Sequence, residues 1–213
     1  HLIPDSASYA CIEYSYLNIN SYSDVVDELL KYIQQLTNNY KVHLLGYSLG
    51  GRLAYSLFCI GSNCLKSTTL ISSGLPIDSA KDRYLKKQFE SMAIQKATLL
   101  SAKEFCYWWY SLPIYGQLKS HVNFEDFISK RSKLFHLNHF KTCIQQLSVL
   151  NMPINSQSSI IQSSPLTYIY GELDQKYKSI AHKISNYYKV NITCINGAGH
   201  LCWYESEIQP LIY

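Results

Sequence analysis

Ser48 has the sequence surroundings of an activated nucleophile. It lies in Gly46-Tyr-Ser-Leu-Gly50, which fits the pattern G-x-S-x-G. In a nucleophile elbow this serine occupies a strained turn between a strand and a helix. The flanking positions must be small there, because a Cβ would keep the backbone from passing close to its neighbours. An ordinary glycine-rich turn has the same pattern by chance, so the elements on either side must decide between the two readings.

Two further residues complete a possible catalytic triad. A serine hydroxyl needs an imidazole to take its proton, and the imidazole needs a carboxylate to fix its tautomer. Asp174 follows the apolar run Tyr168-Ile-Tyr170, and His200 ends Asn196-Gly-Ala-Gly-His200. Both come directly after predicted strands, where catalytic groups gather in open α/β sheets. We therefore predict Ser48, Asp174 and His200 as the catalytic residues.

Other acids and histidines are alternatives to these two. Glu172 is the rival acid, although its place inside the tight turn suits it less well than Asp174. His43 lies within the predicted strand before the elbow, and we expect it to be a packed core residue. The remaining histidines fall on predicted helices and are expected to be solvated: His121, His136, His139 and His182.

The elements around Ser48 predict an α/β sheet. Ser21 and Asp24 form a capping-box pattern before a helix over 22–36, in which apolar residues recur at helical spacing. A short apolar strand at 41–45 stops at Gly46, and a helix follows over 49–60. The next strand is predicted at 68–71. Helix and strand thus alternate over 1–78, the first part of the core.

From about residue 79 the pattern becomes helical, which predicts an inserted helical lid over 79–153. The predicted lid helices cover 80–95, 101–110, 123–134 and 137–149. A polar connector at 155–164 then leads into the second part of the core, 154–213. This part has predicted strands at 166–170 and 189–195, a helix at 176–187 and a terminal helix after Tyr204.

The composition excludes several classes of protein. The chain has 213 residues, of which 47% are hydrophobic and 16% charged, so it is long enough for one full-sized core. It has no apolar run of the ~20 residues that span a bilayer, and its net charge of +4 is too small to favour nucleic acid. Seven irregularly spaced cysteines indicate a reducing compartment rather than a disulfide framework. We expect a soluble protein.

The choice of basic residues is unusual. Only three of the nineteen basic residues are arginines, Arg52, Arg83 and Arg131. Arginine binds a buried carboxylate bidentately and loses its water more readily than lysine does. The resemblance described next implies that the three arginines bind an anionic substrate.

The motifs together resemble the α/β-hydrolase superfamily. More narrowly, they resemble the 2-succinyl-6-hydroxy-2,4-cyclohexadiene-1-carboxylate synthases of menaquinone and phylloquinone biosynthesis. The similar segments are Gly46-Tyr-Ser-Leu-Gly-Gly-Arg52-Leu-Ala54, Ser73-Gly-Leu75, Trp109-Tyr-Ser-Leu-Pro113 followed by Leu118, Arg131-Ser132, Gly171-Glu-Leu-Asp-Gln-Lys-Tyr177 and Gly197-Ala-Gly-His200. The resemblance implies an α/β-hydrolase fold, with a mostly parallel sheet, helices on both faces and an inserted lid.

The resemblance also implies a reaction and a set of site residues. The reaction is that of a carbon–oxygen lyase, in which pyruvate is eliminated from a substrate with three carboxylates. The resemblance implies neither a metal nor a cofactor. Ser48, Asp174 and His200 would be catalytic, and a backbone N–H of Leu49 would help to hold an oxyanion. The implied substrate-binding residues are Tyr47, Leu49, Arg52, Arg83 or Lys86, Trp109 and Arg131.

The beginning of the chain departs from this family. The family has an early His-Gly loop that supplies the second oxyanion N–H, followed by an Asp-x-Pro-Gly-x-Gly turn. Here Pro4-Asp5 corresponds to the start of that turn, and Ser6-Ala-Ser-Tyr9 replaces its glycines. We therefore expect the amino-terminal strands to be missing, as in a fragment.

Two other functions remain open at this point. One is a serine hydrolase that cleaves an ester or a carbon–carbon bond in an anionic substrate, and the other is a non-catalytic binding module. The expected partner is a small-molecule polycarboxylate, with no nucleic acid and no membrane. The resemblance and the composition together favour a bacterial cytoplasm or a plastid stroma.

Overall fold

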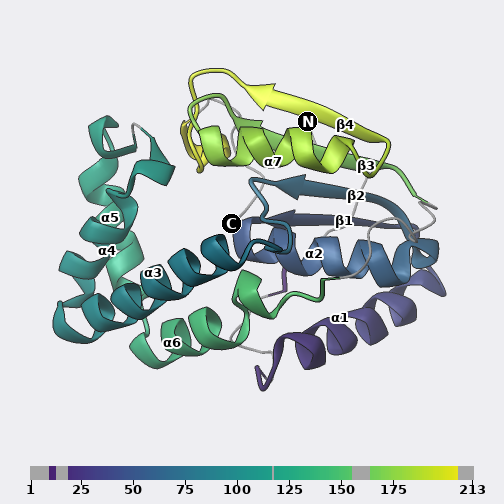
Figure 1. Cartoon of the computed structure of the whole chain (residues 1–213), viewed down its shortest axis with the longest axis horizontal. Coiled ribbons are helices and arrows are strands. Elements are labelled where there is room, and N and C mark those ends of the chain that lie inside the picture. Colours follow the sequence, from purple (N-terminus) through teal and green to yellow (C-terminus); the bar gives the residue numbers. More distant parts are fainter. Residues whose placement is uncertain (1–9, 13–18, 117, 155–163, 206–213) are drawn as a thin grey trace.

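The centre of the molecule is a four-stranded parallel sheet. The computed structural model describes residues 10–12, 19–116, 118–154 and 164–205. Its strands are β1 (Val42–Tyr47), β2 (Leu65–Ile71), β3 (Leu166–Gly171) and β4 (Val190–Ile195), in the order β1-β2-β3-β4 (Figure 1). All neighbouring pairs are parallel. The predicted α/β sheet is therefore confirmed. The predictions for Pro4-Asp5, for 155–163 and for residues after 205 fall outside the described residues.

The helices of the core lie before, between and after these strands in the sequence. They are α1 (Tyr22–Thr37), α2 (Ser48–Gly61), the short 3-10 turn η2 (Ser62–Cys64), α7 (Gln175–Ser185) and α8 (Cys202–Glu205). Ser21 begins α1 as predicted, since its Oγ accepts a hydrogen bond from the N–H of Asp24 at 3.1 Å. The predicted terminal helix after Tyr204 falls almost wholly outside the described residues; within them, α8 begins at Cys202.

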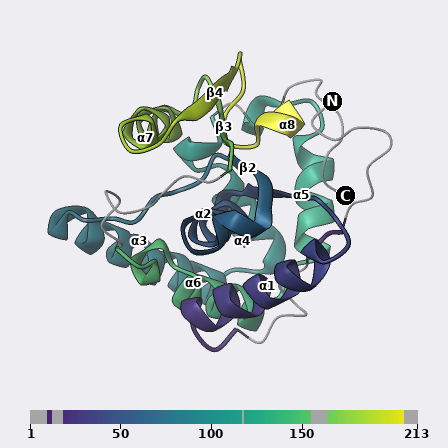
Figure 2. The same cartoon turned by 90° about the vertical axis from the view of Figure 1, so that its right-hand side faces the viewer.

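The two faces of the sheet are covered unequally. Leu70 and Tyr168 point to the face where α1, α2 and α7 pack, and they share one apolar core with Phe58 and Ile184. The next residues along the strands, Ile71 and Ile169, point to the opposite face and contact Ala198 and Cys202 near α8. This alternation is the two-residue period of a strand. Figure 2 shows α7 and α8 on opposite sides of the strands.

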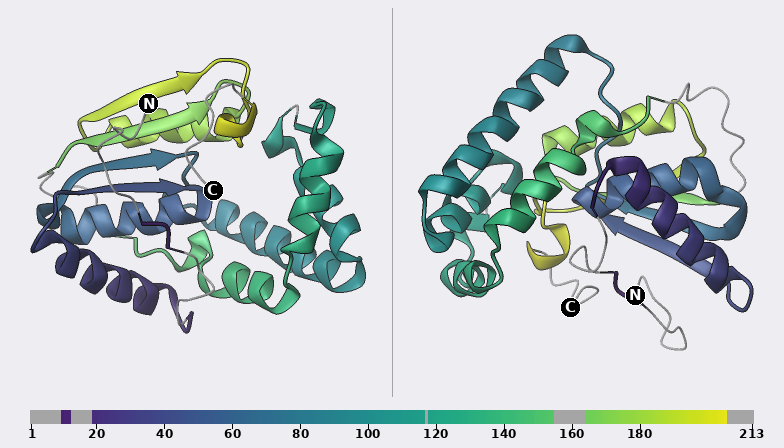
Figure 3. Two further views of the ribbon diagram at one scale, coloured as in Figure 1. Left: turned by 180° about the vertical axis from the view of Figure 1, so that it is seen from behind. Right: turned by 90° about the horizontal axis from the view of Figure 1, so that it is seen from below.

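A helical region lies between β2 and β3 in the sequence. It contains α3 (Ala80–Leu99), α4 (Ala102–Tyr110), η3 (Pro113–Tyr115), η4 (Leu118–Ser120), α5 (Phe124–Lys133), α6 (Leu137–Gln146) and η5 (Val149–Asn151). Its described residues include no strand. The sequence predicted one helix up to residue 149, whereas α6 ends at Gln146 and η5 follows. We call residues 80–151 the lid; it stands beside the carboxyl ends of the strands (Figure 3).

The lid has a small apolar cluster of its own that also touches the core. Leu118, Phe124 and Ile128 are buried in it together with Leu201, which follows His200. Tyr47, next to Ser48, packs against the same cluster. The lid is thereby held against the two segments that carry the predicted serine and histidine. In the described part of the chain, no helix is both long and apolar enough to cross a membrane.

Candidate active site

Ser48 occupies a strained turn between β1 and α2. Its φ angle is +48°, in the left-handed region that non-glycine residues rarely adopt. Gly46 makes the turn possible, because a Cβ there would collide with the carbonyl oxygen of Gly50 and lie 2.7 Å from Cβ of Ala54. Leu49 follows in the first turn of α2, where backbone N–H groups have no partner within the helix.

The acid and the histidine come from two loops that are bonded to each other. The N–H of Leu173 donates to the carbonyl of Ala198 at 2.9 Å, and the N–H of Gly197 donates to the Glu172 carboxylate at 2.8 Å. A Cβ at Gly171 would meet the carbonyl oxygens of Ala198 and Gly199, so only glycine allows this approach. The loop after β3 and the loop after β4 thus form one unit.

Ser48, His200 and Asp174 are joined by two hydrogen bonds. Nε2 of His200 lies 3.0 Å from Oγ of Ser48, and Nδ1 lies 3.0 Å from Oδ2 of Asp174. Asp174 and His200 are only 3% and 2% exposed. An ionised carboxylate only accepts hydrogen bonds, so it holds the ring proton on Nδ1 and leaves Nε2 to accept from the serine hydroxyl. This arrangement can remove a proton at or near Ser48.

The environment keeps the imidazole neutral. Burial lowers the pKa of His200 from its usual value, since a charged ring would lose its water. Asp174 opposes this shift, whereas the positive charges of Lys176 and Arg52 add to it. A neutral imidazole with a free Nε2 is the form that acts as a general base.

Aromatic rings enclose the histidine. Tyr177 stacks on His200 at a ring-centroid distance of 4.8 Å, Tyr47 lies at 5.2 Å, and Tyr115 of the lid meets the ring edge-on at 5.5 Å. Burial raises the pKa values of Tyr47 and Tyr115 well above the usual range, so both stay neutral. Tyr115 and Tyr177 were not among the predicted site residues. The position of Tyr177, directly after the acid at the start of α7, was the available signal.

Three cationic side chains lie within electrostatic range of one another, and two of them, Lys176 and Arg52, also act on His200. Arg52 is one helical turn after Ser48 on α2 and therefore shares its face of the helix. Burial lowers the pKa of Lys176, and the charge of Arg52 lowers it further. The pKa of Lys86 is likewise lowered by burial and by the charges of Arg52 and Lys176, although Glu90 opposes this. We call Arg52, Lys86 and Lys176 the cationic cluster.

The structure separates Arg83 from Lys86, which the sequence left as alternatives. The guanidinium of Arg83 donates to the carbonyls of Ile77 at 3.2 Å and Leu150 at 3.0 Å. These bonds tie the start of α3 to η5. The ammonium group of Lys86 is within electrostatic range of Arg52 and Lys176.

The two predicted lid residues lie in an aromatic part of the lid. Nε of Arg131 donates to the hydroxyl of Tyr110 at 2.9 Å, and the rings of Tyr110 and Tyr115 are 5.1 Å apart. Trp109 packs against Phe105 and Phe140. Arg131 and Trp109 line a cavity of about 330 Å³, together with Phe105, Cys106, Tyr110, Leu134, Phe135, His139 and Phe140. Arg131 is therefore connected to the His200 surroundings through two tyrosines.

The competing acids and histidines are placed elsewhere. Glu172 binds the N–H of Gly197 and supports the histidine loop. His43 was expected in the core, which is wrong, because it is exposed and bonds to Ser67 at 2.7 Å; β1 is an edge strand among the described residues. His136 and His182 are exposed as predicted, whereas His121 and His139 are partly buried.

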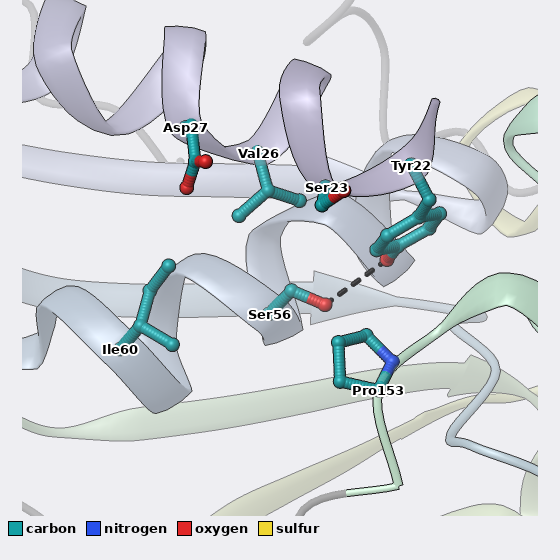
Figure 4. A pocket seen from close by; sticks show the side chains of 7 residues that line it. All are labelled: Tyr22, Ser23, Val26, Asp27, Ser56, Ile60 and Pro153. Atoms are coloured by element: carbon teal, nitrogen blue, oxygen red, sulfur yellow. Dashed lines mark hydrogen bonds between the residues drawn. The ribbon is translucent and has the colours of Figure 1, made fainter. Parts of the chain in front are cut away.

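A second cavity lies away from these residues, between α1 and α2. It has a volume of about 200 Å³, and its lining includes Tyr22, Asp27, Ile60 and Pro153 (Figure 4). The hydroxyl of Tyr22 lies 3.0 Å from Oγ of Ser56 and also donates to the carbonyl of Arg52 at 2.9 Å. These bonds hold the helix that carries Ser48.

Comparison with known proteins identifies the class. The family described as the alpha/beta hydrolase fold matches residues 5–197 of this chain. The chain therefore belongs to the α/β-hydrolase fold family. The solved structure of MenH from S. aureus has the same fold, with a TM-score of 0.77 and 19% identity, and the match covers 88% of this chain and 71% of that one.

Curated relatives narrow the resemblance. A putative 2-succinyl-6-hydroxy-2,4-cyclohexadiene-1-carboxylate synthase of Haemophilus influenzae is 25% identical over 188 residues, covering 87% of this chain and 75% of that protein. The synthase of that name from Klebsiella pneumoniae is 24% identical and covers 79% and 66%. The chloroplastic protein PHYLLO of Arabidopsis thaliana is 25% identical over 200 residues, covering 88% of this chain and 11% of that protein. The resemblance inferred from the motifs is confirmed.

Proposed function

We propose that this protein is a carbon–oxygen lyase of menaquinone or phylloquinone biosynthesis. It would eliminate pyruvate from 2-succinyl-5-enolpyruvyl-6-hydroxy-3-cyclohexene-1-carboxylate to give 2-succinyl-6-hydroxy-2,4-cyclohexadiene-1-carboxylate. The observation that carries the proposal is the hydrogen-bonded set Ser48, His200 and Asp174 beside the cationic cluster. The relatives with synthase names support the same reaction. Because they are bacterial, and one further relative is chloroplastic, we propose a bacterial cytoplasm or a plastid stroma.

In the proposed reaction the triad acts as a base. His200 takes the hydroxyl proton of Ser48, and the serine oxygen removes the proton from the ring carbon that bears the succinyl group. The electrons of that C–H bond form a ring double bond, the existing double bond shifts, and the C–O bond to the enolpyruvyl group breaks. The enolate that departs takes up a proton on its terminal carbon and becomes pyruvate. No acyl-enzyme forms on this route.

Negative charge develops on the succinyl carbonyl as the proton leaves. The backbone N–H of Leu49, at the start of α2, would donate to this oxygen; in other enzymes one such donor contributes about 3 kcal/mol. The substrate also carries three carboxylates. Arg52, Lys86 and Lys176 would bind these groups on the core side, and Arg131 on the lid side, with Tyr47 and Trp109 as walls. Charge-assisted hydrogen bonds of this kind are the strong ones.

A serine hydrolase is the second candidate, and the triad itself is the observation that favours it. The same three side chains can form an acyl-enzyme from an ester. The cationic cluster argues for an anionic ester if the protein is a hydrolase. A non-catalytic binding module has less support, because a strained serine with a bonded imidazole and carboxylate has no evident use in simple binding.

Turnover of two anionic substrates separates the candidates. The first is the enolpyruvyl cyclohexene tricarboxylate, with pyruvate release followed by a coupled lactate dehydrogenase assay. The second is mono(4-nitrophenyl) succinate, an ester that reports hydrolysis. We expect rapid pyruvate release and, at best, slow ester cleavage. Rapid ester cleavage without pyruvate release would reject the lyase in favour of the hydrolase, and no turnover of either would favour the binding module.

A further inference from the structure

Glu90 is a buried carboxylate that the proposed reaction does not use. It lies on α3 and is only 8% exposed. Its Oε1 accepts a hydrogen bond from Oγ of Ser148 at 2.7 Å and lies 3.1 Å from Nζ of Lys86. A buried carboxylate costs stability unless its charge is paired, so this group needs both partners.

Lys86 connects Glu90 to the cationic cluster. It precedes Glu90 by four residues, so the two side chains share one face of α3. The methylene stem of Lys86 brings its ammonium group within 5.3 Å of the Phe89 ring centre, and the side chain is mostly buried. The other charged groups that act on it are Arg52 from α2 and Lys176 from α7. Glu90 is the carboxylate paired with this lysine in the described residues.

The direction of the Glu90 carboxylate is fixed from the other side of the lid. Ser148 is 4% exposed, and its Oγ accepts a hydrogen bond from the N–H of Leu150 at 3.0 Å. The hydroxyl proton of Ser148 is therefore free to point at Glu90. Arg83 binds the carbonyl of the same Leu150, so two residues of α3 hold η5 in place. A carboxylate held in this way gives Lys86 one preferred orientation.

We propose that Glu90 is a positioning residue that keeps Lys86 protonated and directed at an anionic group of the substrate. The inference rests on the proposed function in taking that substrate to be anionic. Three cations in a partly buried site repel one another. This repulsion can be relieved by the loss of a proton from a lysine, because an arginine guanidinium keeps its proton more firmly than a lysine ammonium group does. Glu90 offsets this repulsion at Lys86 without neutralising Arg52 or Lys176.

The sign of the expected pH effect follows from the surrounding groups. Burial, Arg52 and Lys176 lower the pKa of Lys86, and Glu90 raises it. In Glu90→Gln the amide keeps the size of the side chain and can still accept from Ser148, but the negative charge is gone. The pKa of Lys86 then falls, and binding of an anion that needs protonated Lys86 is lost at a lower pH than in the unmodified protein.

The first test measures Lys86 directly and needs no turnover. The protein is labelled with lysine carrying ¹³C at Cε, and the Lys86 signal is assigned by its loss in Lys86→Arg. We expect the NMR titration of Lys86 to move to lower pH in Glu90→Gln. Asp126→Asn is the matched control, because Asp126 pairs with Lys130 at the same spacing on α5 but is exposed. An unchanged Lys86 titration in Glu90→Gln would overturn the proposal.

The second test measures anion binding by calorimetry with 2-succinylbenzoate, a dicarboxylate that carries the succinyl side chain. At one tenfold change per pKa unit, we expect Glu90→Gln to weaken binding about tenfold at pH 9 and less than about twofold at pH 6. Glu90→Gln/Lys86→Arg should regain most of the affinity at pH 9, because arginine stays protonated. Equal weakening at both pH values, with no rescue by arginine, would show that Glu90 is merely structural.

These tests also distinguish failure of the inference from failure of the proposed function. If the unmodified protein does not release pyruvate but the Lys86 titration shifts, the lyase proposal fails and the positioning role stands. If pyruvate is released normally and the titration does not shift, only the positioning role fails. If Glu90→Gln does not fold, Glu90→Asp shortens the reach to Lys86, and a Lys86 titration unmoved in that variant would also overturn the inference.

Discussion

Asp174 has two roles in the structure, and Asp174→Asn should remove one while sparing the other. One carboxylate oxygen accepts from the imidazole of His200 at 3.0 Å, and the other accepts from the N–H of Tyr177 at 3.2 Å. The second bond makes Asp174 the N-cap of α7. Asparagine caps helices about as well as aspartate does, so the fold should be kept.

The expected loss of activity follows from the single oxygen of the amide. If that oxygen stays on Tyr177, the NH₂ group faces Nδ1 of His200 and selects the tautomer with its proton on Nε2. His200 can then no longer accept the proton of Ser48. In serine enzymes the corresponding change lowers kcat about 10⁴-fold. Since each tenfold is about 1.36 kcal/mol, the barrier should rise by about 5 kcal/mol.

Two variants and two assays separate these roles. Pyruvate release gives kcat, and urea denaturation gives the free energy of unfolding. Asp174→Asn should lose activity with little change in stability, whereas Asp174→Ala should lose activity and also about 1 kcal/mol of stability from the missing cap. If Asp174→Asn keeps more than about a tenth of the activity, Asp174 does not orient the catalytic base and the reasoning from tautomers is wrong.

Three further predictions follow from the site. Burial and the charges of Lys176 and Arg52 lower the pKa of His200, so the fall of kcat on the acidic side of its pH profile should have a midpoint below about 6.5, the value for free histidine. Lys176→Met should move this midpoint to higher pH, and a move to lower pH would contradict the reasoning. Gly46→Ala should lower the free energy of unfolding in urea by about 1–3 kcal/mol, because the new methyl group meets Gly50 and Ala54; an unchanged midpoint would argue against the close approach. Arg52→Met should raise the KM of the tricarboxylate by roughly tenfold or more but barely change that of 4-nitrophenyl acetate, and an equal rise for both would remove Arg52 from anion binding.

Much of the core could be predicted from local sequence. The apolar run before Ser48 predicted a strand that stops at Gly46, whereas β1 continues to Tyr47; the helix after it has a continuous apolar face, so the elbow could be predicted from neighbouring residues alone. Asp174 and His200 also follow strand ends, and parallel strands bring their carboxyl ends to one edge of the sheet. Both predictions use only residues that are neighbours in the sequence, and few other folds satisfy the same patterns.

The parts that could not be predicted depend on contacts between distant segments. Nothing in the sequence near Tyr115 shows that its ring meets His200. Arg83 and Lys86 are three residues apart on one helix, and only the position of η5 shows which of them is used structurally. His43 had the apolar neighbours of a core residue, but burial depends on what covers β1, which local pattern does not report.

The most direct test of the account compares pyruvate release by the unmodified protein and by Ser48→Ala, with the enolpyruvyl cyclohexene tricarboxylate as substrate and circular dichroism as a check of folding. If Ser48 is the group that removes the ring proton, the alanine variant should fold normally, still bind 2-succinylbenzoate, and release pyruvate at least about 10³-fold more slowly. A Ser48→Ala protein that releases pyruvate at the unmodified rate would contradict the proposed triad and the reaction assigned to it.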